Sequence, residues 1–317
     1  MATETLAPAE GVGAGVALPT PILQAQAVSK QFPGVLALDQ VDFELRAGEV
    51  HVLFGENGAG KSTLIQMLAG VHAPTAGSLR FRGEPLDLQG VHHARTLGIS
   101  AVFQEFSLVP TLTVEDNLFL GAELTSRGFI DKSELHRRAD DILKRLGFPL
   151  RPRQRVQDLS RAEQQMVEIA KAFRTDLSVL ILDEPTASLT DREAQRLFAM
   201  IEQAKSRGVG VVYVTHRMSE IGHIGDRVTV LRDGKRVATL DVAEADDERL
   251  LQLMTGRVIS QVFPQIAYRP GRPLLEVSGL TTADHLVRGL SLTVRAGEVV
   301  GLAGAYRERK AADQMVG

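Results

Sequence analysis

Residues 55–63 read GENGAGKST, and this stretch decides the fold. It fits the pattern G-x-x-x-x-G-K-[ST], in which glycines let successive backbone N–H groups converge on phosphate oxygens at the start of a helix. The alternative is an ordinary glycine-rich turn. A strand pattern at 51–54 and a helical pattern at 64–69 flank the stretch, as a phosphate-binding loop requires. The predicted phosphate-binding residues are Gly55, Glu56, Asn57, Gly58, Ala59, Gly60, Lys61, Ser62 and Thr63.

The lysine and the serine of this loop carry its chemistry. Lys61 is placed to reach the β- and γ-phosphates of ATP, and the Ser62 hydroxyl is placed to bind Mg²⁺. Lys61 would also offset the charge that develops when a phosphoryl group is transferred to water. The loop therefore predicts ATP and Mg²⁺ as ligands.

Two adjacent carboxylates, Asp183 and Glu184, follow the continuous apolar run 179–182. Such a run is typical of a strand buried on both faces, and open parallel sheets bind ligands at the carboxyl ends of their strands. Asp183 can hold magnesium through water, and Glu184 can polarise an attacking water. The alternative is a charged strand end before a turn at Pro185. The phosphate-binding loop upstream favours the functional interpretation.

Strands and helices alternate after residue 50, which predicts an α/β fold with a parallel sheet covered by helices. A second buried strand is expected at 209–215. Thr190 and Glu193 form a capping box that opens a helix, and Gly208 ends it. The dipeptide Asp233-Gly234 lies between two apolar runs and predicts a hairpin, so the sheet gains an antiparallel portion.

Composition indicates a globular protein and argues against nucleic-acid binding, cysteine chemistry, membrane spans and secretion. Hydrophobic residues make up 44% and charged residues 24% of the 317 residues, which is ordinary for a globular protein. A net charge of −3 gives no basic surface for nucleic acid, and the absence of cysteine excludes disulfides, zinc–thiolate sites and thiol catalysis. No apolar run reaches the roughly 18 residues of a membrane span, and no basic residue precedes Lys30 to start a secretion signal. We expect a soluble, cytoplasmic protein.

An internal repeat sets the domain boundaries. Residues 46–50, RAGEV, recur as 295–299 after a similar alternating strand pattern. We therefore expect a flexible tail at 1–21, a complete domain at 22–265, a linker at 266–273 and the truncated start of a second copy at 274–317. At the same offset Arg307, Arg309 and Ala311 replace Gly58, Gly60 and Ser62, so no second P-loop is expected there. The segment 273–317 should be poorly packed and expose apolar residues of 274–302.

The order of motifs along the chain resembles that of ABC-type ATPases over residues 23–260. The resemblance implies a P-loop NTPase core with a parallel sheet, an antiparallel β-subdomain and a helical subdomain. It also implies that Gln104 binds the metal and couples the site to a membrane partner, and that His216 contacts the γ-phosphate. Phe32 would stack on adenine. The alternative for Gln104 is a surface amide, for His216 a buried imidazole at a strand end, and for Phe32 a core aromatic. The motifs are GENGAGKST, VFQE around Gln104, LS ending at Ser160, the Asp183-Glu184 pair and THR around His216.

Residues 32–71, 164–171, 213–218 and 254–257 are similar to the tandem ATPase subunits of bacterial monosaccharide importers. This similarity implies a subunit that hydrolyses ATP to drive carbohydrate import, lying on the inner face of the membrane. Its partners would be a permease, a sugar-binding protein reached through the permease, and a second nucleotide-binding domain from a missing half or a homodimer. The segment 106–118 would contact the permease, or would simply be core of the helical subdomain.

Two other functions stay open. One is a soluble tandem ABC protein acting on ribosomes or DNA, which the short proline-rich linker and the acidic balance disfavour. The other is a truncated product that binds ATP but neither closes nor transports.

The chain departs from the resemblance at the signature loop. Residues 159–163 read LSRAE where the family usually has LSGGQ, so Arg161 and Ala162 replace two glycines. In the family this helix start, here Ser160, donates to a γ-phosphate held by the opposite domain. Ser160 and Glu163 also fit a capping box. Glu163 would bring negative charge near that phosphate and weaken hydrolysis, unless it folds back to cap. Thr190 stands where the family commonly has aspartate.

Overall fold

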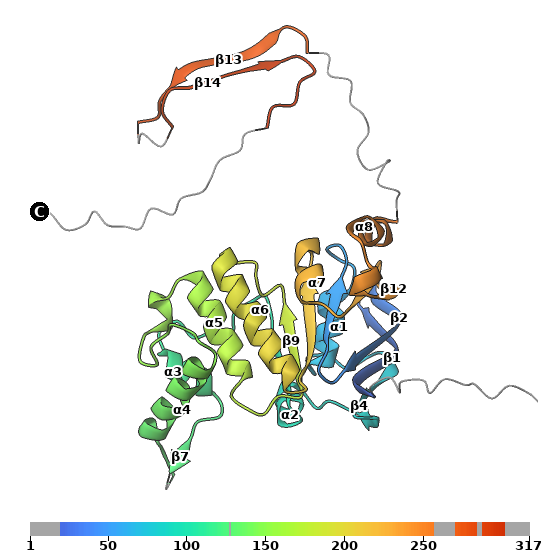
Figure 1. Cartoon of the computed structure of the whole chain (residues 1–317), viewed down its shortest axis with the longest axis vertical. Coiled ribbons are helices and arrows are strands. Elements are labelled where there is room, and N and C mark those ends of the chain that lie inside the picture. The colour runs from blue at the N-terminus through green and yellow to red at the C-terminus, as the bar shows by residue number, and fades with distance from the viewer. Residues whose placement is uncertain (1–19, 127, 257–269, 284–286, 302–317) are drawn as a thin grey trace, which may run out of the picture. The chain divides into compact units, whose positions relative to one another are not determined.

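The structure is a computed structural model that describes residues 20–126, 128–256, 270–283 and 287–301. The chain divides into two compact units, Met1–Ile259 and Ser260–Gly317, each considered by itself (Figure 1). Within these described ranges, no helix combines the length and the apolar character needed to cross a bilayer. The expected tail at 1–21 falls outside the description except for its last two residues, and Pro21 already begins a strand.

The centre of the first unit is a six-stranded sheet in the order β12-β11-β3-β10-β9-β6. The five strands from β11 to β6 are parallel, and β12 returns antiparallel after the turn at Asp233-Gly234, as predicted. Because the parallel strands share one direction, their carboxyl ends meet at one edge. The strands are β3 (Val50–Phe54), β6 (Ile99–Val102), β9 (Val179–Asp183), β10 (Gly210–Thr215), β11 (Arg227–Arg232) and β12 (Lys235–Asp241).

Different layers cover the two faces of this sheet (Figure 1). Alternate residues of β3 show the division, because Val52 and Phe54 enter the core beneath α5, α6 and α7, whereas Leu53 enters the core beneath α1. The predicted helix after Thr190 forms and carries its capping box. The helices are α1 (Lys61–Leu68), α2 (Val91–Thr96), α3 (Val114–Phe119), α4 (Lys132–Arg145), α5 (Arg161–Ala172), α6 (Asp191–Ser206), α7 (Met218–Ile224) and α8 (Asp247–Thr255).

A four-stranded antiparallel sheet, ordered β2-β1-β4-β5, packs on the same side as α1. Val41, Phe43 and Leu45 alternate into its core, as their spacing predicts. The register between β1 and β2 shifts at four places along β1, and Ala27 has a left-handed φ of 46°. The strands are β1 (Pro21–Phe32), β2 (Val35–Arg46), β4 (Ala76–Phe81) and β5 (Glu84–Leu86).

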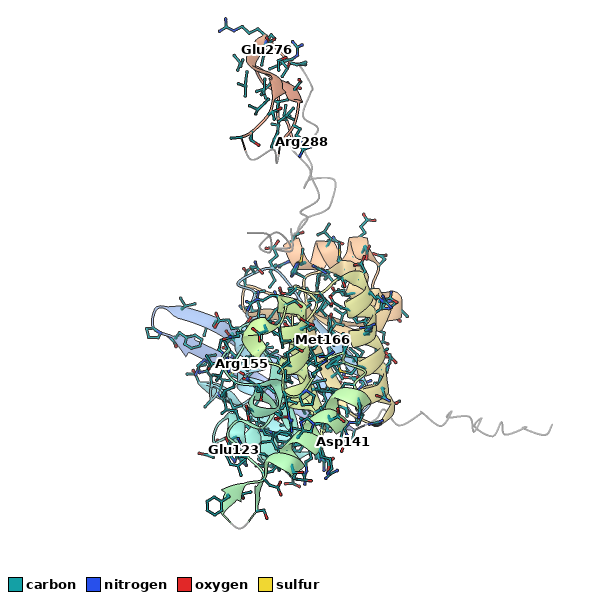
Figure 2. The ribbon with its side chains drawn as sticks, turned by 90° about the vertical axis from the view of Figure 1, so that its left-hand side faces the viewer. Glu123, Asp141, Arg155, Met166, Glu276 and Arg288 are labelled. Atoms are coloured by element: carbon teal, nitrogen blue, oxygen red, sulfur yellow. The ribbon has the colours of Figure 1, made fainter. Side chains whose placement is uncertain are left out.

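The helical subdomain consists of α3, α4 and α5, with the short hairpin of β7 (Thr125–Ser126) and β8 (Phe129–Ile130). In Figure 2, Met166 of α5 lies within the body of the unit, and Glu123 and Asp141 lie at its edge. Val114 and Leu118 are fully buried. The end of segment 106–118 is therefore core of this subdomain, which is the simpler of the two interpretations for these residues.

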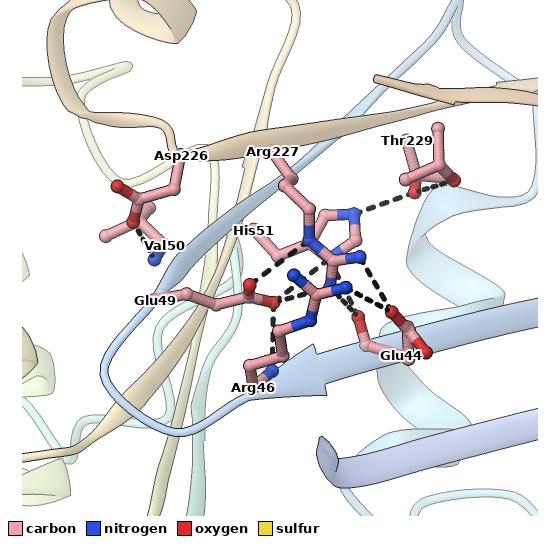
Figure 3. A network of polar contacts seen from close by, with 9 residues as sticks. Glu44, Arg46, Glu49, Val50, His51, Asp226, Arg227 and Thr229 are labelled. Atoms are coloured by element: carbon pink, nitrogen blue, oxygen red, sulfur yellow. Dashed lines mark hydrogen bonds and ion pairs between the residues drawn. The ribbon is translucent and has the colours of Figure 1, made fainter. Parts of the chain in front are cut away.

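A buried network of charged and polar groups joins the start of β3 to the start of β11 (Figure 3). The Arg227 guanidinium donates to Glu49 at 2.8 Å and to Glu44 at 2.7 Å. His51 Nδ1 lies 2.8 Å from the Glu44 carbonyl oxygen, an acceptor, so Nδ1 carries the proton and Nε2 accepts from Thr229. Burial lowers the pKa of His51, which keeps the ring neutral.

Burial by itself would raise the pKa of Glu49. Hydrogen bonds from His51, Arg227 and the Arg46 N–H outweigh burial and hold that pKa at about 2. The network therefore keeps a charged carboxylate inside the fold.

The second unit contains a hairpin of β13 (Pro273–Leu280) and β14 (Leu290–Arg295). Its turn repeats a hydrogen bond of the first unit: Arg295 N donates to Glu298 at 2.8 Å, as Arg46 N donates to Glu49 at 2.9 Å. The expected exposure of apolar residues is confirmed within the described part, at Leu274, Leu275, Leu280, Val299 and Val300. The comparison of 304–311 with the P-loop lies outside the described residues.

Candidate functional site

The loop after β3 has the backbone shape that its glycines predict. Gly58 has a φ of 84°, and Gly60, the N-cap of α1, has a φ of 99°. A Cβ on Gly60 would lie 2.8 Å from the Ala37 carbonyl oxygen and 2.6 Å from the Leu38 side chain. Since glycine has no side chain to cap α1, the first N–H groups of this helix are left for an anion. The loop is a cradle for phosphate.

Lys61 folds back over this loop. Its ammonium donates to the carbonyl oxygens of Gly55 at 2.7 Å and Glu56 at 2.9 Å, and the residue is only 6% exposed. Burial lowers the pKa of Lys61, and the charges of Glu184 and Asp183 act in the opposite direction. The cation is thus held at the centre of the site with acidic groups facing it.

The two acidic residues occupy the carboxyl end of β9, beside the end of β10. Burial, and then the neighbouring Glu184 carboxylate, raise the pKa of Asp183 to about 6. Glu184 has a left-handed φ of 44°, and its N–H donates to the Val214 carbonyl oxygen at 3.0 Å. His216 Nδ1 lies 2.9 Å from Glu184 Oε1. The structure therefore pairs these two predicted catalytic side chains directly.

One cavity of about 1010 Å³ collects most of the predicted residues. Ser62, Gln104 and Asp183 all line it, and hydroxyl, amide and carboxylate oxygens are the donors that Mg²⁺ prefers. The residues present therefore fit the metal that the P-loop implies. The predicted residues in the lining are Gly55, Glu56, Asn57, Gly58, Gly60, Lys61, Ser62, Thr63, Gln104, Asp183, Glu184 and His216. Ala59 is buried behind the loop, where its carbonyl oxygen accepts from Gly234 N at 3.2 Å.

The apolar side chains of the cavity are ones that the sequence did not single out. Val35, Leu36 and Met254 line it, and Val35 and Leu36 are large apolar residues that are more than half exposed. Phe32 is not part of this lining. The centroids of the Phe32 and His72 rings lie 5.5 Å apart in a T-shaped arrangement, and the Lys30 ammonium lies 5.4 Å from the Phe32 centroid. The exposure of Val35 and Leu36 beside the P-loop is visible only in the structure, so the sequence held no signal that could have found them.

Ser160 lies away from this cavity, at the N-terminus of α5. Its capping box with Glu163 is complete: Ser160 N donates to the Glu163 carboxylate at 2.8 Å, and Glu163 N donates to Ser160 Oγ at 3.3 Å. The Glu163 side chain thus folds back to cap the helix. The Arg161 guanidinium lies 4.3 Å from the centroid of Phe106. The altered signature loop is held by contacts within its own domain.

Comparison with known proteins identifies the family. Residues 38–187 match the model of the ABC transporter family. A ribose import ATP-binding protein of Rubrobacter xylanophilus, RbsA 1, is 50% identical over 284 residues, which are 90% of this chain and 56% of that protein. A ribose import ATP-binding protein of Streptomyces coelicolor, RbsA 2, is 49% identical over 90% of this chain and 55% of its own. The chain thus spans about half the length of these curated relatives.

Solved structures agree on the fold. A nucleotide-free ATP-binding cassette of an ABC transporter superposes with a TM-score of 0.66 at 23% identity, covering 78% of this chain and 100% of its own. A bacterial ABC transporter cassette solved as a dimer gives 0.62 at 26% identity over 69% of this chain and 98% of its own. The P-loop, the β9 carboxylates and these similarities together show that the chain belongs to the ABC transporter family, with an ATP-binding cassette of the P-loop NTPase fold.

Proposed function

We propose that this chain is an ATP-binding subunit that hydrolyses ATP to drive the import of a carbohydrate through a membrane permease. The observation that carries the proposal is the single cavity that brings the P-loop, Asp183, Glu184 and His216 together. The relatives named for ribose import support a monosaccharide as the transported class. The permease and the sugar-binding protein are the proposed partners, and the inner face of the cell membrane is the proposed location.

The binding half of the mechanism uses the P-loop. Its backbone N–H groups and the start of α1 hold the phosphates of ATP, while Lys61 moves its ammonium from loop carbonyls to phosphate oxygens. Ser62, Gln104 and Asp183 would hold Mg²⁺, which when bound neutralises charge on the β- and γ-phosphates. Asp183 must be ionised for this role.

The hydrolytic half uses the pair at the sheet edge. Glu184 orients a water molecule toward the γ-phosphate and accepts a proton from it. His216 fixes the Glu184 carboxylate through the 2.9 Å contact and faces the same cavity. Most of the rate enhancement then comes from positioning and charge stabilisation.

We further propose that the site is completed by a second nucleotide-binding domain. Ser160 lies outside the cavity of its own domain, as it would if it served the site of a partner cassette, and a 26% identical cassette has been solved as a dimer. Residues 22–265 would form one such domain and 274–317 the start of another. The repeated turn hydrogen bonds of Glu49 and Glu298 support this division. The isolated chain should bind ATP and hydrolyse it slowly.

Binding of Mg-ATP tests the site. Lys61→Ala should weaken it roughly 10- to 100-fold, the loss expected for a charged hydrogen-bond donor to phosphate. Lys144→Ala is the matched control, since the Lys144 side chain is exposed on α4 and should leave affinity unchanged. Isothermal titration calorimetry on both variants gives the comparison. Equal affinities for Lys61→Ala and the unmodified protein would sink the assignment.

Transport tests the wider proposal. Cells in which Glu184→Gln replaces the unmodified protein should lose uptake of a radiolabelled monosaccharide, because the permease no longer receives the energy of hydrolysis. Uptake of ribose is measured first, given the relatives. Full uptake of every monosaccharide tried would refute the assignment to carbohydrate import.

A further inference from the structure

A buried carboxylate lies beneath the catalytic pair. Glu220 of α7 is 7% exposed and accepts hydrogen bonds from three hydroxyl groups. The Thr186 hydroxyl donates at 2.6 Å, that of Thr215 at 2.7 Å and that of Tyr213 at 3.0 Å. The Arg217 guanidinium lies 3.5 Å away and balances part of the charge. Such a fully hydrogen-bonded buried carboxylate is a rigid anchor.

Two of the three hydroxyls lie within two residues of the catalytic pair. Thr186 follows Glu184 by two residues after the end of β9. Thr215 is the last residue of β10 and directly precedes His216. Glu220 therefore joins the ends of two neighbouring strands through one side chain. It is not among the residues that line the cavity, so it acts without touching the nucleotide.

The backbone at Glu184 needs such an anchor. Its φ of 44° lies in the left-handed region, which is unfavourable for a residue with a side chain and persists only where neighbours impose it. On one side the Glu184 N–H is bound to β10, and on the other Thr186 is bound to Glu220. The same carboxylate fixes Thr215, whose oxygen also accepts from Arg217 N at 3.0 Å. Glu220 therefore binds residues close to both Glu184 and His216 in the chain.

We propose that Glu220 is a positioning residue for ATP hydrolysis, holding Glu184 and His216 at the distance and orientation that turnover requires. The inference rests on the proposed function of the same site. Without the carboxylate, the segments after β9 and β10 lose their shared hydrogen-bond partner and the Glu184–His216 contact lengthens, while the strand ladder and the P-loop keep their shape.

Three variants of the full chain test this role. Glu220→Gln keeps the shape of the side chain but replaces one acceptor oxygen by an amide donor. Thr215→Val keeps Glu220 but removes the Thr215 hydroxyl, which links Glu220 to the strand end before His216 and accepts from Arg217 N. Tyr213→Phe is the matched control, because it removes one hydroxyl from the same carboxylate while the hydroxyls of Thr186 and Thr215, next to the two strand ends, stay bound to it. The Mg-ATP dissociation constant, kcat and the ring ¹⁵N signals of His216 are measured on folded protein, with His216→Gln assigning those signals.

The expected result is a split between binding and turnover. Glu220→Gln and Thr215→Val should lower kcat at least 10-fold, change Mg-ATP affinity less than 3-fold and shift the His216 signals. Tyr213→Phe should lower the melting temperature and leave kcat and those signals unchanged. Unmoved His216 signals in both Glu220→Gln and Thr215→Val would overturn the inference, and this readout needs no turnover. Absence of Mg-ATP binding and hydrolysis in the unmodified protein would instead contradict the proposed function.

Discussion

The sharpest prediction concerns Glu49, the central carboxylate of the network in Figure 3. Its pKa is about 2 in the folded protein and 4.5 without the fold. A carboxyl whose pKa falls on folding stabilises the fold when it is ionised. The contribution is fully present above pH 4.5 and is lost as the pH falls toward 2.

The size of the effect follows from the two pKa values. The difference between 4.5 and about 2 corresponds to about 3 kcal/mol of unfolding free energy at neutral pH. Breaking a buried ion pair by removing one partner costs about 3–5 kcal/mol, and Glu44 still pairs with Arg227 when Glu49 is replaced. We therefore expect Glu49→Gln to lower the stability of the first unit by about 3 kcal/mol at pH 7. For a domain of this size that is a fall of about 10 °C in Tm.

Urea unfolding at pH 7 and at pH 3 measures both the size and the pH dependence. At pH 3 the difference between Glu49→Gln and the unmodified protein should shrink by about 2 kcal/mol, because Glu49 is then almost fully protonated in the unfolded chain and still mostly ionised in the folded protein. Glu202→Gln, an exposed carboxylate of α6, is the control and should change stability by less than about 0.5 kcal/mol. A loss from Glu49→Gln that is as small as the control, or equal at both pH values, would refute the reasoning.

Three further predictions concern the P-loop, the cavity lining and the start of α5. Gly60→Ala should lower the free energy of unfolding by at least about 3 kcal/mol and abolish Mg-ATP binding, because its Cβ would lie 2.8 Å from a backbone carbonyl oxygen. Gly58→Ala introduces only the strain of its positive φ and should lower it by about 1–2 kcal/mol. Equal losses for the two variants in urea unfolding would contradict this. Met254→Ala should weaken ATP binding several-fold and leave the binding of inorganic tripolyphosphate unaffected, because Met254 lines the cavity. Calorimetry showing a loss of ATP affinity for Phe32→Ala and none for Met254→Ala would assign the base contact to Phe32 instead, as the sequence predicts. Glu163→Gln should change stability by less than about 0.5 kcal/mol, because the amide oxygen still accepts from Ser160 N; a loss above 1 kcal/mol on thermal unfolding would show that the charge itself caps α5.

Local signals in the sequence were sufficient wherever a short segment decides its own structure. The P-loop, the buried strand before Asp183 and the helix starts at Ser160 and Thr190 are of this kind. Each depends on residues within a few positions, so neither the rest of the fold nor a relative is needed to see them. The alternation of Val41, Phe43 and Leu45 is similar, because it reports one buried face.

The apolar part of the cavity lining could not be derived in this way. The expectation for Phe32 stays untested by any bound nucleotide, but the structure puts Val35, Leu36 and Met254 into the lining instead. A strand's faces follow from simple alternation only where its register is regular. In β1 the register shifts between Ala25 and Val28 and again near Lys30, and each shift changes which residues share a face. Met254 arrives from α8, far along the chain.

Polar contacts between residues far apart in the chain could not be predicted from the sequence either. Glu49 and Arg227 are separated by 178 positions, and Thr186 and Glu220 by 34. Singly, each of these residues resembles an ordinary surface side chain, because charged and hydroxyl residues are mostly exposed. Only the pairing of strands β3 and β11, and of β9 and β10, brings the groups together.

The strands beneath the site have a consequence for amide hydrogen exchange. Every residue of β3, β9 and β10 is buried, and these three strands are neighbours in the sheet. Amides in such a region exchange with solvent only when the whole domain opens. Deuterium should therefore enter the strands that mount the P-loop, Asp183 and His216 at one slow, common rate, and ATP should slow all three strands alike because its binding stabilises the folded domain. We therefore expect strands β3, β9 and β10 to keep their arrangement through a catalytic cycle. Changes caused by nucleotide binding should be confined to the loops and side chains at the ends of these strands.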